Sequence, residues 1–118
     1  MPFLRKKQIT LDGITVTIGS ILSCEAEEMF TAQREIFDQP ETTPESKLIR
    51  IRKSWDDFIA KSLTRGEAKP APEGGWSAEN IHKEFDKGFL ALLLDEIREM
   101  NGVGVVKGEV KAPSTSPS

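Results

Sequence analysis

Residues 8–18 read QITLDGITVTI, and this stretch decides how the chain begins to fold. Asp12 and Gly13 lie between two runs of alternating apolar and polar residues. This is a strong signal for a two-residue β-hairpin, because both central positions of a type I′ turn need a positive φ. Closing the turn there places these residues opposite one another on one face: Leu11 and Ile14, Ile9 and Val16, Lys7 and Ile18. Since a slip of one residue would move the apolar side chains to the other face, we predict a well-defined hairpin over residues 7–18.

The apolar face of this hairpin must be covered by the rest of the chain, because two isolated strands are only marginally stable in water. The chain has 118 residues, of which 37% are hydrophobic and 30% charged, with a formal net charge of −3. This composition is typical of a globular domain, and the length fits one domain with a single core. We therefore predict one domain over residues 1–108 and a disordered tail over residues 109–118.

Cysteine usage and hydropathy favour a cytoplasmic protein. Cys24 is the only cysteine, so the chain has no internal disulfide, as is usual in a reducing compartment. We expect Cys24 to be an inert, partly buried thiol. No apolar run approaches the roughly 20 residues that span a bilayer, and the basic start MPFLRKKQ lacks the apolar segment of a signal peptide. Membrane contact is therefore not expected.

Three amphipathic helices are predicted after the hairpin. From residue 22 the apolar period changes from two to about 3.6, which predicts a helix over about 21–37 capped by Ser20 or Ser23. Gln33 interrupts its apolar stripe. Its amide is either buried with a hydrogen-bond partner or exposed at a gap in the stripe, and we favour the exposed position. Thr43 followed by Pro44 predicts the start of a helix over 44–65, which ends at Gly66.

A linker over residues 66–76, GEAKPAPEGGW, precedes the third helix. Ser77 is its expected cap and Asn101-Gly102 its end, so we place this helix over 77–101. Val103, Val105 and Val106 favour a short strand added to the hairpin, although the nearby glycines weaken it. The predicted fold is therefore α+β and mostly α, with an N-terminal β-hairpin packed on three amphipathic helices.

The third helix has a wider apolar surface than one packed side requires. Its main stripe consists of Ile81, Phe85, Phe89, Leu92, Leu93, Ile97 and Met100. Leu90 and Leu94 extend the apolar arc beyond half of the circumference, whereas packing on one side needs only about 100 to 140°. Either this helix is central, between the hairpin and the other helices, or a partner protein or second copy covers it. For the second case the predicted protein-binding residues are Trp76, at the rim, and Phe85, Phe89, Leu90 and Leu94.

We predict no catalytic, cofactor or metal site. His82 is the only histidine, so a catalytic triad or multi-histidine metal site would depend on it alone, and we interpret it as a structural or surface residue. Asp56 and Asp57 are adjacent on a helix and point about 100° apart. The carboxylates Asp95, Glu96 and Glu99 are interpreted as a solvated group, and GVGVVKG, residues 102–108, lacks the spacing of a phosphate-binding loop. A binding or structural protein is therefore expected, and an enzyme is not.

The order of these parts resembles the tail assembly chaperones of long-tailed bacteriophages over residues 4–104. The resemblance rests on the hairpin LDGITVTI, an acidic helix, a basic helix, and the segment WSAENIHKEFDKGFLALLLDEIREMNGV. The positions of the final helix that match the family pattern are Ser77, Glu79, Ile81, Phe85, Leu92, Leu93, Ile97 and Gly102. The chain departs from the pattern in the longer Pro/Gly-rich insertion from Gly66 to Gly75.

The resemblance implies a non-enzymatic protein that binds and solubilises the helical tape measure protein in the host cytoplasm during tail assembly. It also implies self-association, and it suggests the tail tube protein as a second partner. A structural subunit of a tail or another assembly is the alternative. A small nucleic-acid-binding regulator would use Arg5, Lys6, Lys7, Arg50 and Lys53, but the negative net charge disfavours it.

Overall fold

The computed structural model describes residues 3–40 and 43–103 and confirms the α+β, mostly α fold class. The elements in chain order are β1 (Lys6–Leu11), β2 (Ile14–Gly19), α1 (Ser23–Phe37), α2 (Pro44–Gly66), α3 (Ile81–Glu84) and α4 (Lys87–Asn101). The predicted tail over 109–118, the domain's end at 104–108 and most of the predicted strand over 103–106 lie outside these residues. Val103, the last residue described, is buried and is not in a strand.

The hairpin has the predicted turn and register. Asp12 and Gly13 have φ values of 50° and 78°, and the antiparallel pairs are the ones that the alternation specifies. On the outer face the hydroxyl groups of Thr10 and Thr15 are hydrogen-bonded at 2.9 Å. The inner face buries Ile9, Val16 and Ile18, whereas next to the turn Leu11 is half-buried and Ile14 is 48% exposed.

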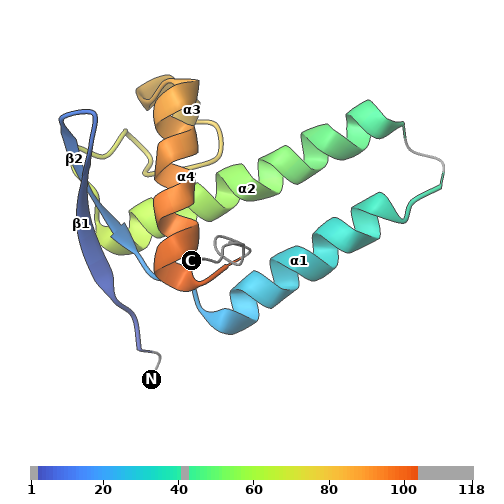
Figure 1. The fold of residues 1–118 in the computed structure, drawn as a ribbon. Coiled ribbons are helices and arrows are strands. Elements are labelled where there is room, and N and C mark those ends of the chain that lie inside the picture. Colours follow the sequence, from blue (N-terminus) through green and yellow to red (C-terminus); the bar gives the residue numbers. More distant parts are fainter. Residues whose placement is uncertain (1–2, 41–42, 104–118) are drawn as a thin grey trace, which may run out of the picture.

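The helices are arranged as a long hairpin crossed by a shorter helix. Figure 1 shows α1 and α2 side by side and antiparallel, with α4 crossing α2 in the half of α2 that lies next to the β-hairpin. The core forms where β2, α2 and α4 meet, and its fully buried apolar residues are Ile18, Leu63, Ile81, Leu93 and Ile97. The N-terminal half of α2 extends beyond α4 with α1 along one side of it (Figure 1).

Two glycines allow β2 to pack directly on the backbone of α2. A Cβ at Gly19 would lie 2.5 Å from Cβ of Arg65, and one at Gly66 would lie 2.7 Å from the carbonyl carbon of Ile18. The buried Ser62 hydroxyl donates a 2.7 Å hydrogen bond to the Gly19 carbonyl at this junction. Gly66 is the last residue of α2, but the left-handed residue that ends the helix is Glu67, with φ of 55°.

The predicted helix starts are partly correct. Thr43 caps α2, because its Oγ1 accepts from the Ser46 N–H at 3.2 Å, and Pro44 is the first helical residue. Neither Ser20 nor Ser23 caps α1. That helix starts after Leu22, whose N–H donates at 2.9 Å to Oε1 of Glu25, so a carboxylate in the first turn replaces the predicted serine cap.

Two expectations for side chains of α1 are wrong. Gln33 is half-buried and its amide donates to the Ser54 hydroxyl of α2 at 2.6 Å, so it links the two helices rather than filling an exposed gap. Cys24, in the first turn of α1, is exposed rather than partly buried.

The prediction of one continuous helix over 77–101 is wrong. Phe85 is extended, with φ of −129° and ψ of 147°, and it separates the short α3 from α4. Asp86 starts α4 by accepting a 2.8 Å hydrogen bond from the Phe89 N–H. Ser77 accepts from the Asn80 N–H at 3.0 Å in the turn that precedes α3. Gly102, with φ of 64°, ends α4 as predicted.

Candidate functional site

Three of the five predicted protein-binding residues form an internal aromatic stack. The Trp76 and Phe85 rings are 5.6 Å apart and nearly parallel, and Phe85 stacks on Phe89 at 4.9 Å. The Trp76 indole N–H donates to the Ala68 carbonyl at 3.2 Å, and Phe89 is only 5% exposed. This stack holds the linker and α3 against α4. It is therefore part of the packing of the domain rather than an open surface.

The other two predicted residues, Leu90 and Leu94, face α2. Leu90 is 6% exposed and belongs to the core, and Leu94 is half-buried at its edge. Because β1 and α2 both pack on α4, the helix is central, which explains most of its wide apolar arc. Leu92, which the predicted stripe included, is 41% exposed instead.

Leu90 and Leu94 form one wall of an apolar groove between α4 and the N-terminal half of α2. The groove has a volume of about 500 Å³. Its apolar lining residues are Leu48, Ile51, Trp55 and Ile59 of α2 and Leu90, Ala91 and Leu94 of α4. Trp55 is fixed within it by edge-on contacts with Phe30 and Phe58 and by the Arg98 guanidinium, which lies 5.1 Å from the centre of the indole.

The length of α2 explains why the groove exists. A helix of 23 residues is about 35 Å long, whereas a crossing helix is only about 10 Å wide. Helix α4 therefore covers one part of α2, and the apolar stripe of α2 continues past it. Leu48 and Ile49, on this continuation, are 54% and 64% exposed. Leu48 and Ile51 are not among the predicted protein-binding residues, although the length of the predicted helix over 44–65 indicated that one crossing helix could not cover its whole apolar stripe.

Polar residues border the groove. His82 of α3 donates from Nε2 to Oδ2 of Asp56 of α2 at 2.8 Å, so this pair ties α3 to α2 at one end. This contact agrees with the interpretation of His82 as a structural or surface residue. Arg52 and Lys87 line the groove as well, and neither makes an ion pair or side-chain hydrogen bond within residues 3–40 and 43–103.

The shortest ion pair among residues 3–40 and 43–103 lies away from the groove. Arg65 donates to both carboxylate oxygens of Glu25 at 2.5 Å, and Lys61 lies 3.4 Å from the same carboxylate. These hydrogen bonds, chiefly those from Arg65, lower the pKa of Glu25 to about 2. The pair joins the start of α1 to the end of α2, so it positions the helical hairpin.

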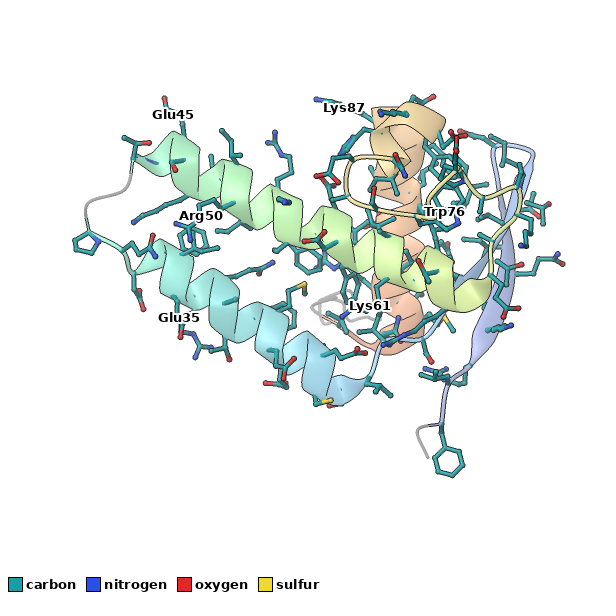
Figure 2. The ribbon with its side chains drawn as sticks, turned by 180° about the vertical axis from the view of Figure 1, so that it is seen from behind. Glu35, Glu45, Arg50, Lys61, Trp76 and Lys87 are labelled. Atoms are coloured by element: carbon teal, nitrogen blue, oxygen red, sulfur yellow. The ribbon has the colours of Figure 1, made fainter. Side chains whose placement is uncertain are left out.

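The basic residues of the nucleic-acid alternative do not form one surface. Lys6 pairs with Glu67 at 2.8 Å and Lys7 with Glu96 at 3.8 Å, both from β1. Arg50 donates to Gln39 at 2.7 Å between α1 and α2, and Figure 2 shows it at the other end of the molecule from β1. The structure therefore divides these cations between two separate regions.

Neither a metal-binding cluster nor a membrane-spanning helix is found in the described part of the chain. Within residues 3–40 and 43–103, no group of three or more histidine, cysteine, aspartate or glutamate residues could hold a metal ion. No helix in these ranges is long and apolar enough to cross a membrane. No protein-family model, curated protein or solved structure matches the chain. A function must therefore be inferred from its own residues.

Proposed function

We propose that this chain is a non-enzymatic tail assembly chaperone that binds an amphipathic helix of the tape measure protein and keeps that protein soluble during phage tail assembly. The groove between α2 and α4 carries the proposal. It is open, lined mainly by apolar side chains, and includes Leu48, which is 54% exposed. The order of the hairpin and the helices resembles the order in that chaperone family and supports the same proposal.

A helical partner suits this groove for physical reasons. Grooves between helices commonly bind an amphipathic helix through apolar residues spaced at i, i+3, i+4 and i+7. A few large apolar contacts around a rigid centre provide most of the affinity in such interfaces. Trp55 supplies that centre, since three neighbouring side chains fix its ring. An exposed apolar patch of this kind is typical of interaction sites.

Co-expression with a phage tape measure protein tests the proposal. We expect the tape measure protein to move from the insoluble to the soluble fraction in the presence of the chain. Leu48→Asp should abolish this effect, because it places a charge on the exposed part of the groove without touching the core. Leu92→Asp is the matched control, since Leu92 is exposed on α4 outside the groove.

Equal solubilisation by the wild type, Leu48→Asp and Leu92→Asp would show that the groove is not the binding surface. A tape measure protein that stays insoluble with every variant would overturn the chaperone proposal itself. Mass spectrometry of purified virions distinguishes the alternative, because a structural subunit is retained in the particle and a chaperone is not.

Self-association, which the resemblance implies, stays a prediction. The solution mass over a concentration series, measured by light scattering after size exclusion, tests it. A mass above 13.1 kDa that rises with concentration is the expected result. A monomer at every concentration would contradict it and would leave the groove available to a partner helix.

A further inference from the structure

We infer that the groove between α2 and α4 selects an acidic amphipathic helix of another protein, with carboxylates on both sides of its apolar stripe. The inference rests on the proposed function, because it names the chemistry of the helix that the same groove would bind. Its basis is the distribution of charge along the two walls of the groove.

Each wall of the groove carries one cation. Arg52 belongs to α2 and Lys87 to the first turn of α4, and both line the groove. Among the residues that the structure describes, neither one forms an ion pair or a side-chain hydrogen bond. Figure 2 shows Lys87 projecting from the start of α4 toward the side on which the N-terminal half of α2 lies. One charge therefore lies on each of the two helices that form the groove.

The acidic residues nearby offset these charges only in part. Asp56, the one carboxylate in the lining, is hydrogen-bonded to His82 at 2.8 Å and its side chain is 17% exposed. Asp86, next to Lys87, accepts the N–H of Phe89 as the cap of α4. Glu45 is seven residues from Arg52, which is about 10 Å along a helix, and does not line the groove. The lining thus carries two cations against one carboxylate, and an incoming helix meets an apolar floor with one cation on each wall.

This arrangement defines a sequence signature for the partner. A helix that inserts apolar residues at heptad positions a and d has its e and g positions on the two flanks of that stripe. Glutamate or aspartate at position e would face one of the two cations, Arg52 or Lys87. The same residues at position g would face the other cation. Charged flanks of this kind select partners and orientation, as they do in coiled coils. Lysine at the same positions would be repelled by both walls.

Three synthetic helices test the inference directly. Each is a fluorescein-labelled peptide of three heptads, about 21 residues, with leucine at a and d and with only glutamate, only glutamine or only lysine at e and g. Fluorescence anisotropy with the full chain measures each dissociation constant. We expect the glutamate peptide to bind about tenfold more tightly than the glutamine peptide at low salt, with the lysine peptide weakest, and the difference to shrink at high salt.

A matched pair of double variants separates a specific site from general charge attraction. Arg52→Gln with Lys87→Gln should remove the preference for the glutamate peptide. Lys53→Gln with Lys83→Gln removes the same charge from exposed positions outside the groove and should keep the preference. Loss of the preference in both double variants would overturn the inference.

The outcomes also distinguish this inference from the proposed function. Equal affinity for the glutamate and glutamine peptides, lost in Leu48→Asp, would mean that the groove binds helices without regard to charge; the inference would fail and the proposed function would stand. No binding of any peptide would overturn the inference, and solubilisation of the tape measure protein would then test the function alone. Dimers of the chain that Leu48→Asp dissociates would identify a second copy as the occupant and would likewise overturn it.

Discussion

Gly66 of α2 lies so close to Thr17 of β2 that a Cβ at residue 66 would be only 2.7 Å from the Thr17 carbonyl carbon. Gly19 makes the reciprocal approach to Arg65. The hairpin is thus held against α2 by direct backbone contact, and its position depends on the absence of two side chains. Since the same helix forms one wall of the groove, this junction fixes α2 relative to the core.

The first prediction concerns this close approach. Gly66→Ala should lower the free energy of unfolding by about 2 kcal/mol, because the added methyl group meets backbone atoms that cannot move away as a flexible side chain would. Urea denaturation monitored by circular dichroism measures the change. Gly88→Ala is the control: a Cβ there meets only Oδ1 of Asp86 at 3.5 Å, so alanine should stabilise α4 by about 0.5 to 1 kcal/mol. Similar effects of both substitutions would contradict the prediction.

The second prediction compares two hydroxyl groups of α2. Ser62 is fully buried and donates to the Gly19 carbonyl at 2.7 Å, whereas Thr64 is exposed and donates to the Ala60 carbonyl at 2.8 Å within its own helix. Ser62→Ala should lower the free energy of unfolding by about 1 to 2 kcal/mol, since it leaves a buried carbonyl with one partner fewer. Thr64→Ala should change it by less than about 0.5 kcal/mol, because water replaces the lost contact. The midpoints of urea unfolding test this, and equal losses would show that burial is not the deciding factor.

The parts of the fold that the sequence predicts correctly are those with local signals. Asp12 and Gly13 define the hairpin register by themselves, and Thr43 with Pro44 defines the start of α2. In each case the residues that carry the signal are neighbours in the chain. Long-range packing is not needed to specify them.

The parts that the sequence analysis missed depend on competition between local and distant contacts. The apolar residues over 77–101 fit one helix, but Asp86 caps a new helix and Phe85 stacks on Trp76, and together these contacts break the pattern. The groove was missed for a related reason. Whether Leu48 is core or surface depends on where α4 crosses α2, and no pattern along the chain specifies a crossing point.

The third prediction follows from the pKa of Glu25. Its pKa in the folded protein is about 2, below the ordinary value of 4.5, because Arg65 donates two hydrogen bonds to the ionised carboxylate. The stability that this carboxylate contributes is fully present above pH 4.5 and is lost as the pH falls toward 2. Glu25→Gln should therefore be less stable than the wild type at pH 7, and the difference should narrow in acid.

Urea unfolding at pH 7, 4 and 3 measures this convergence. Glu28→Gln is the matched control, because Glu28 lies in the same helix and makes no ion pair within the described ranges 3–40 and 43–103. The free energy of unfolding of Glu28→Gln should differ little from that of the wild type, and this difference should not shrink as the pH falls. A constant gap between wild type and Glu25→Gln across this pH range would contradict the prediction.

The fourth prediction concerns the break between α3 and α4. Asp86→Ala should lower the free energy of unfolding by about 1 kcal/mol, because it removes the side chain that accepts the Phe89 N–H at 2.8 Å. Hydrogen exchange of that amide, followed by NMR, should become faster, and Asp86→Ser should restore both values since serine is also a good N-cap. Asp95→Ala is the control: Asp95 is exposed in the middle of the same helix. If Asp86→Ala and Asp95→Ala have the same stability and exchange, the cap does not hold α4 at this position, and the break must instead be maintained by the stack of Trp76 on Phe85.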